Sequence, residues 1–153
     1  MNRQYSSFEL VNRGYTRWMS KNGTTALRLT LAITFLWFGW LKLIGKSPLN
    51  EVVKETASPL IPRNLAVPVT GVLEVLIGLG LLTRIALPVT MVLFFGQMLS
   101  TFLVLIRLPQ KAFQHGNPLL LTDTGQFVVK NLVLFSAGLV VASTIGKDSD
   151  DPA

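Results

Sequence analysis

The chain has 153 residues, of which 50% are hydrophobic and 14% are charged, and its formal net charge is +6. It contains no cysteine and a single histidine, His115, so cysteine-based redox chemistry, cysteine-bound metals and a bis-histidine haem within the chain are excluded. Long apolar blocks separated by short polar joints predict one integral membrane domain. The basic residues are then expected beside lipid head groups, and nucleic-acid binding is not expected.

Residues 1–22 are basic but also carry apolar side chains at helical spacing. These apolar side chains recur at three- and four-residue steps: Phe8, Val11, Tyr15, Trp18 and Met19. The pattern predicts an amphipathic helix lying on the membrane surface. A frayed basic tail is the alternative.

Residues 26–44 predict the first membrane span, close to the roughly 20 residues that a crossing needs. Arg28 lies at the start of this span, where its side chain can reach head groups. Lys42 lies near the other end. At helical spacing its face also carries Phe35, Phe38 and Gly39. Expected on the opposite, lipid-facing side are Trp37 and Trp40.

A connecting segment, residues 45–64, contains a short amphipathic stretch. Ser47 followed by Pro48 predicts the start of a short interfacial helix. Its expected apolar face consists of Leu49, Val52, Val53 and Ala57. We expect this helix to fold over the mouth of the bundle.

The second predicted span, residues 65–82, carries the carboxylate of Glu74 near its middle. A charge at the centre of a membrane helix costs roughly 2.5–3.5 kcal/mol on insertion scales, so a partner or a task is expected. Gly71 and Gly78 share the face of Glu74 and would let a neighbouring helix come close, which places Glu74 inside the bundle.

The third predicted span, residues 85–106, follows a very short joint and therefore forms an antiparallel hairpin with the second. Gln97 and Thr101 form a polar stripe on one of its faces. This stripe contacts a ligand in one interpretation. In the other, it only supplies hydrogen bonds between helices.

The last predicted span, residues 126–145, carries Lys130 and Asn131 one to two turns from its start. Asp123, three residues before Gln126, resembles a capping box that opens this helix. The loop before it holds His115, whose role is open. Residues 146–153 are acidic and polar and are expected to be disordered.

These elements predict an all-α fold, an integral membrane four-helix bundle with two interfacial helices. Basic residues are more numerous beside the spans on the N-terminal side, which favours both termini in the cytoplasm. On that side lie Arg3, Arg13, Arg17, Lys21, Arg28, Arg84 and Lys147. On the other side lie Lys46, Lys54, Arg63, Arg107 and Lys111.

The polar side chains of the spans are expected to form one pocket. Its candidate ligand-binding residues are Lys42, Glu74, Gln97, Thr101, Lys130 and Asn131. Lys130 is within side-chain reach of Glu74, directly or through a water. Such a pocket could bind a polar head group with an apolar tail, such as a quinone. An ion pair that only fixes helix register is an equally weighted alternative. The pattern indicates no metal site and no covalent cofactor.

Several motifs resemble one family in order and spacing, over about residues 36–139. They are FLWFGWLKLIG with SPLIP, GVLEVLIGLGLL, and FLVLIRLP, HGNPLL and GQFVVKNLVLF. These resemble the DoxX-like superfamily, in particular its YkgB-like branch. The resemblance implies a four-helix protein of the bacterial inner membrane. It also implies links to quinone-coupled oxidation, as in the DoxX subunit of thiosulfate:quinone oxidoreductase, or to defence against oxidative stress.

The same resemblance points to four polar positions of the spans: Lys42, Glu74, Lys130 and Asn131. The YkgB-like branch often has aspartate where Asn131 stands, which weakens any proton relay there.

Three functions remain open at this point. The first is a membrane subunit that binds a quinone or similar amphiphile, while a separate soluble or peripheral oxidoreductase handles the electrons. The second is a transporter or channel for a small solute or protons. The third is a structural or assembly subunit of a membrane complex. Small residues on the third and fourth spans would also permit a homodimer.

Overall fold

A computed structural model describes residues 7–57 and 61–146. Its helices are α1 (Ser7–Leu43), α2 (Asn50–Thr56), α3 (Arg63–Thr83), α4 (Leu87–Arg107), α5 (Pro109–Ala112) and α6 (Asp123–Ala142), with a 3₁₀ turn at Gln114–Gly116. Among the described residues, four helical segments are long and apolar enough to cross a membrane: Tyr15–Leu43, Arg63–Thr83, Leu87–Arg107 and Asp123–Ala142. The predicted all-α bundle of four long apolar helices is therefore confirmed.

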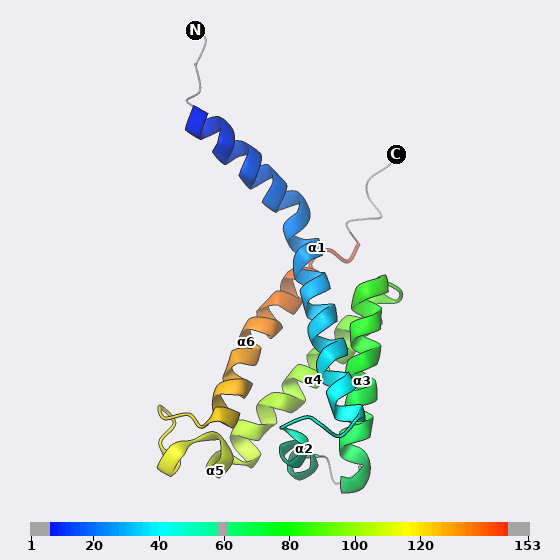
Figure 1. The fold of residues 1–153 in the computed structure, drawn as a ribbon, viewed down its shortest axis with the longest axis vertical. Coiled ribbons are helices and arrows are strands. Elements are labelled where there is room, and N and C mark those ends of the chain that lie inside the picture. Colours follow the sequence, from blue (N-terminus) through cyan, green and yellow to red (C-terminus); the bar gives the residue numbers. More distant parts are fainter. Residues whose placement is uncertain (1–6, 58–60, 147–153) are drawn as a thin grey trace.

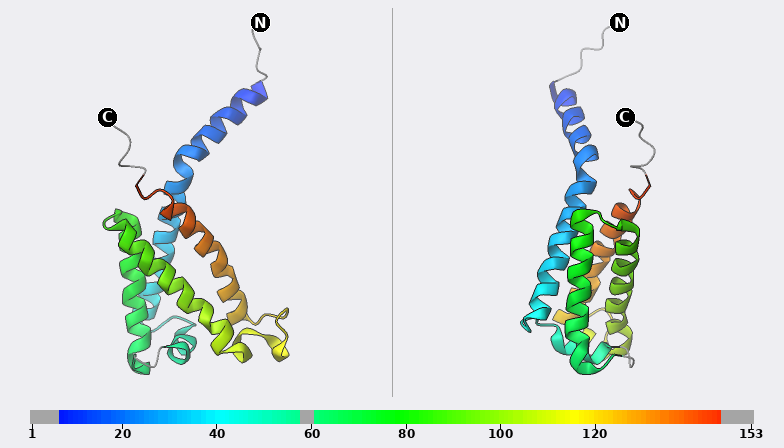
Figure 2. Two further views of the ribbon diagram at one scale, coloured as in Figure 1. Left: turned by 180° about the vertical axis from the view of Figure 1, so that it is seen from behind. Right: turned by 90° about the vertical axis from the view of Figure 1, so that its right-hand side faces the viewer.

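The long helices form a closed ring in which α1 packs on α3 and α6, and α4 packs on the same two helices. Figures 1 and 2 show that both ends of the described chain lie at one end of the bundle, whereas α2 and α5 lie at the other. This arrangement gathers the two longer connections at one mouth, as expected from four spans.

α1 is one continuous helix, where the sequence indicated a surface helix over residues 1–22 and a separate span over 26–44. The only glycine between these segments, Gly23, costs about 1 kcal/mol within a helix, which is too little to end it. The Asn22 side chain also donates to the Trp18 carbonyl oxygen at 3.0 Å along the same helix. The first turns of α1 project beyond the other helices (Figure 1). Residues 1–6 lie outside the described residues, as does the expected disordered tail over 146–153 apart from Gly146.

Helix ends differ by a few residues from the predicted ones. α6 is capped by Thr122 rather than Asp123, because the Thr122 hydroxyl accepts a hydrogen bond from the Gly125 amide at 3.1 Å. Asp123 instead occupies the first turn, where a carboxylate is favoured by the helix dipole. α2 begins at Asn50, and not directly after Ser47 as predicted. The Ser47 hydroxyl accepts a hydrogen bond from the Leu49 amide at 3.4 Å, within the turn that precedes the helix.

The hydrophobic core fills the half of the bundle nearer the chain ends. The rings of Phe35 and Phe94 belong to this core and meet with centroids 5.1 Å apart, and Phe35 also lines the cavity described below. Gly138 provides the space for Phe94, because a Cβ at residue 138 would overlap that ring. The fully buried members of this core are Leu31, Ala32, Ile77, Leu81, Phe94 and Val141.

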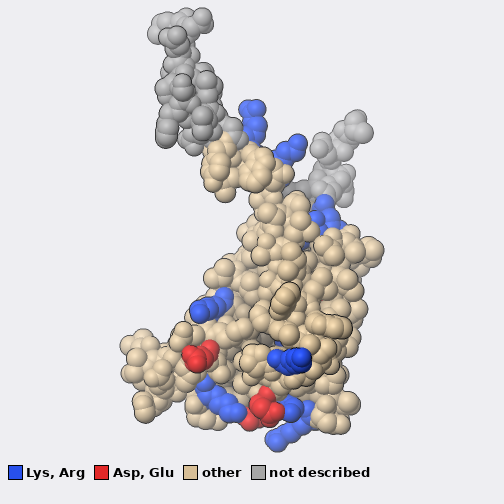
Figure 3. All heavy atoms as spheres, viewed as in Figure 1, with Lys and Arg blue, Asp and Glu red and all other residues tan. Residues whose placement is uncertain are grey.

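Charged side chains lie toward the two ends of the bundle on the face seen in Figure 3, with an uncharged belt between them. The exposed side chains of Trp37 and Trp40 lie on the outside of α1, as predicted. Arg28 has a more specific role than reaching head groups, because its guanidinium donates to the carbonyl oxygens of Leu81 and Leu82 at the end of α3. Arg28 thus caps α3 from the neighbouring helix.

Candidate functional site

An ion pair between α1 and α3 forms the centre of the site. The Lys42 ammonium lies 2.6 Å from each carboxylate oxygen of Glu74. Both residues are buried, with exposed fractions of 7% and 8%. A buried carboxylate is tolerated when a close, well-oriented counter-charge offsets its lost hydration. The prediction that Glu74 points into the bundle is confirmed, and its partner is Lys42.

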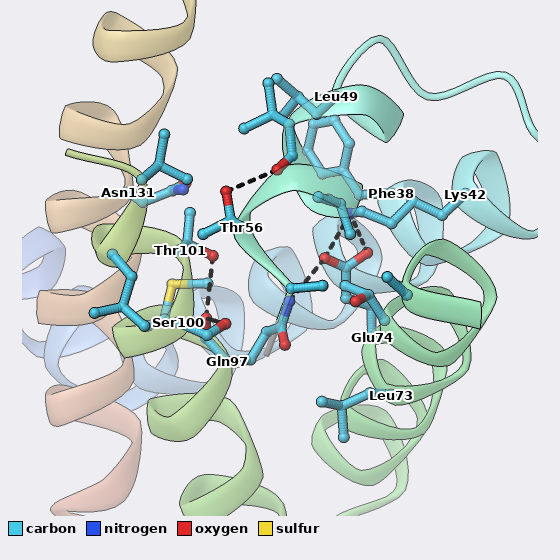
Figure 4. A pocket seen from close by; sticks show the side chains of 18 of the residues that line it. Phe38, Lys42, Leu49, Thr56, Leu73, Glu74, Gln97, Ser100, Thr101 and Asn131 are labelled. Carbon is cyan, nitrogen blue, oxygen red and sulfur yellow. Dashed lines mark hydrogen bonds and ion pairs between the residues drawn. The ribbon is translucent and has the colours of Figure 1, made fainter. Parts of the chain in front are cut away.

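The ion pair is extended by the amide of Gln97 on α4. The Gln97 side-chain nitrogen donates to Glu74 Oε1 at 3.4 Å, a long hydrogen bond. The hydroxyls of Ser100 and Thr101 both donate to the backbone carbonyl oxygen of Gln97, one turn earlier in α4, at 2.7 and 3.0 Å. Figure 4 shows Lys42, Glu74 and Gln97 pointing toward one another at one wall of a pocket. Three helices therefore meet at one polar cluster.

This cluster faces a cavity of about 770 Å³ in the half of the bundle opposite the core. The volume falls within the range of about 300–1,000 Å³ that is typical of small-molecule sites. All four long helices and α2 contribute to its walls, which are mainly aliphatic and aromatic. The polar and charged side chains among the lining residues are Thr34, Lys42, Thr56, Thr70, Glu74, Gln97, Ser100, Thr101, Arg107, Thr124 and Asn131.

α2 covers the mouth of this cavity, as the sequence predicted. The cavity is lined by Val52 and Val53 of α2 and by Leu49, which directly precedes this helix. Two contacts tie α2 to the opposite wall: the Arg107 guanidinium donates to the Thr56 carbonyl oxygen at 2.9 Å, and the Lys111 ammonium lies 2.8 Å from a Glu55 oxygen. α2 is therefore held as a lid by α4 and by the segment that follows it.

The outer face of α2 carries a further ion pair. The Lys54 ammonium lies 2.7 Å from a Glu51 oxygen. This hydrogen bond and the positive charge of Lys54 hold the pKa of the Glu51 carboxyl below its usual value. Both groups are exposed, so the pair orients the surface of the lid and adds little stability.

Five of the six candidate residues line the cavity: Lys42, Glu74, Gln97, Thr101 and Asn131. Asn131 is buried, and Figure 4 shows its side chain on the wall opposite Glu74. Lys130 is the exception, and the predicted Lys130–Glu74 bridge is wrong. Lys130 is exposed because one residue along a helix rotates a side chain by about 100° from Asn131, which faces inward.

Among the lining residues that the sequence analysis did not name as site residues are Arg107 and Phe127. Arg107 was counted only as a basic flank, and Phe127 was not considered. Both could have been found from helical spacing: Arg107 lies seven residues after Ser100 on the same face, and Phe127 lies four residues before Asn131. His115 has a left-handed backbone in the exposed turn after α5, outside the spans.

The site offers proton donors and acceptors but few metal ligands. Across residues 7–57 and 61–146, no group of three or more His, Asp or Glu side chains could hold a metal ion. The ammonium and the two amides can instead donate to the oxygens of a polar head group, and the carboxylate can accept from a hydroxyl of that group, while the apolar walls bury a larger organic body.

The DoxX family model matches residues 23–107, which is more than half of the chain. The chain belongs to the DoxX family. The matched region includes Lys42, Glu74, Gln97 and the lid helix α2, and it ends at Arg107. No curated protein and no solved structure matches the chain. Family membership and the four apolar helices identify a multi-pass membrane protein. The YkgB-like branch stays a prediction.

Proposed function

We propose that this DoxX protein is a membrane subunit that binds a quinone or a similar amphiphilic redox molecule in the cavity. One observation carries the proposal: a buried, multiply bonded acid–base cluster forms one wall of a large apolar cavity. A structural ion pair alone does not need such a volume beside it.

We place the two oxygens of the quinone ring at the two polar walls of the cavity. Lys42 and Gln97 supply donors near Glu74 on one side, and the Asn131 amide supplies a donor on the other. Glu74 can accept or return a proton when the bound ring changes its redox state. The electrons come from a separate soluble or peripheral oxidoreductase.

The packed core favours a binding site rather than a channel as the function of this bundle. Phe35 lines the cavity and packs on Phe94, and the buried side chains of the core continue to the other end of the bundle. A solute path through the bundle would have to open this core. The proposed location is the bacterial inner membrane with both termini in the cytoplasm. Reporter fusions at each terminus test this orientation.

A binding titration in lipid nanodiscs tests the function. Ubiquinone is added to the wild type, Gln97→Ala, Asn131→Leu, Glu74→Gln and, as the matched control, Lys130→Ala. We expect saturable binding by the wild type and the control, and at least a tenfold weaker affinity for the three cavity variants, which corresponds to about 1.4 kcal/mol.

Either of two outcomes overturns the proposal. One is a wild type that binds no quinone above the level of empty nanodiscs. The other is a set of cavity variants that bind as tightly as the control. Circular dichroism and gel-filtration profiles confirm that each variant is folded, and Asn131→Leu keeps the test valid if a change at the ion pair unfolds the bundle.

A further inference from the structure

The walls of the cavity differ in how well they are sealed. Between α1 and α6, the rings of Phe38 and Phe127 meet edge to face with centroids 5.9 Å apart. Between α4 and α6, outside the residues that line the cavity, Phe135 packs against Phe95 and Phe102 with ring centroids 5.1 and 6.3 Å apart. Large aromatic rings therefore join α6 to both of its neighbouring helices.

The gap between α3 and α4 is lined differently. The two helices are joined at the end of the bundle near the core, and they diverge toward the α2 end (Figure 2). The cavity residues along this gap are small or aliphatic and partly exposed: Val69 is 46% and Leu93 is 38% exposed. Gly96 lines the cavity one turn after Leu93, and a Cβ at that position would meet no described atom within 4 Å.

We propose that the cavity opens sideways into the bilayer between α3 and α4, through a window centred on Gly96. The occupant is a bilayer-dissolved molecule whose hydrocarbon chain lies in this window while its polar head reaches Glu74. The identity of the head rests on the proposed function. The lateral window does not, because it follows from the exposure of the cavity walls.

The lid makes the opposite route unfavourable. A ligand that entered at the lid would first have to expose its hydrocarbon chain to water, which is unfavourable. It would then have to pass the charged mouth of the cavity, where Arg107 and Lys111 hold α2 in place. A molecule that moves through the window keeps its apolar chain in hydrocarbon throughout. The hydrocarbon chain of the ligand then contacts Gly96, and its length and branching become determinants of specificity.

The absence of cysteine from the chain permits a direct test with a single label. A bimane fluorophore is attached at Thr101→Cys, inside the cavity, and the protein is reconstituted in vesicles of dibromo-phosphatidylcholine, whose bromines quench on contact. We expect clear quenching at residue 101. Adding Gly96→Phe, which fills the window, reduces it at least twofold, and Gly96→Leu reduces it to a smaller extent.

The matched control is Ile33→Phe, which introduces the same ring at an exposed position of α1 that does not line the cavity. It leaves the quenching unchanged. A label at the lipid-exposed position Val133→Cys reports that the bromolipid is present and effective. The proposal is overturned if residue 101 is not quenched while residue 133 is, or if Gly96→Phe changes nothing.

This experiment separates the two proposals. Quenching that depends on Gly96, together with absent quinone binding, leaves the window intact and overturns the proposed function. Quinone binding without quenching at residue 101 does the reverse and places the route of the ligand elsewhere.

Discussion

Gly39 and Gly71 meet backbone to backbone where α1 crosses α3. A Cβ at residue 39 would lie 2.8 Å from the Gly71 carbonyl oxygen, and one at residue 71 would lie 3.1 Å from the Gly39 carbonyl oxygen. This close approach brings Lys42, one turn after Gly39, within 2.6 Å of Glu74, one turn after Gly71. The two glycines therefore set the distance on which the ion pair depends.

Gly39→Ala tests this relationship. The added methyl group must push α3 away, and overpacking of this kind costs about 1–3 kcal/mol. The free energy of unfolding, measured in detergent with a chemical denaturant, should fall by that amount. The control is Gly23→Ala, where a Cβ meets no described atom within 4 Å and the helix gains about 0.5–1 kcal/mol. Equal effects of the two changes would contradict the account.

The ion pair itself is tested by removing one partner and then both. Lys42→Met leaves the Glu74 carboxylate buried without its counter-charge, which typically costs about 3–5 kcal/mol. The double change Lys42→Met with Glu74→Gln should recover most of that loss. Lys130→Met, at an exposed lysine, should change the free energy of unfolding by less than about 0.5 kcal/mol. The pairing is refuted if Lys42→Met is as mild as Lys130→Met.

The lid is expected to loosen when its ion pair to Lys111 is broken. Glu55→Lys places two like charges together, so the amides of Asn50–Thr56 should exchange hydrogen up to about fivefold faster, given the 0.2–1 kcal/mol typical of exposed pairs. The reversed pair, Glu55→Lys with Lys111→Glu, should restore slow exchange. Unchanged exchange in the single variant at low salt would show that the pair does not hold the lid.

Arg28 is expected to stabilise the end of α3 through hydrogen bonds to its last carbonyl oxygens. Arg28→Met should lower the free energy of unfolding by about 1 kcal/mol, because the charged donor is lost while the apolar stem is kept. Arg17→Met, at an exposed position of the projecting part of α1, serves as the control. A loss no larger than that of the control would exclude the capping role.

Helical spacing was enough to predict the spans, the inward face of Glu74 and the apolar face of the lid. These features depend on which residues share a face, and that property is local to each helix. The prediction that Gly71 allows a close helix approach is also confirmed, since a Cβ there would meet Gly39 and Lys42.

The choice between Lys42 and Lys130 could not be made in the same way. It depends on the rotation of α6 about its own axis, which is set by the packing of Phe127 on Phe38 and of Phe135 on Phe95. Such contacts join distant parts of the chain and leave no periodic signal. The continuity of α1 was missed for a different, local reason. The single glycine at residue 23 disfavours the helix only weakly, and this does not outweigh the helix propensity of the residues on both sides.

The central claim is that the cavity beside Lys42 and Glu74 holds the head of an amphiphilic redox molecule. Mass spectrometry of the small molecules extracted from protein purified from its native membrane tests it most directly. The account predicts a quinone in stoichiometric amount with the wild type and with Lys130→Ala, and its loss from Gln97→Ala and Asn131→Leu. A wild type without bound quinone, or equal amounts in all four proteins, would contradict it.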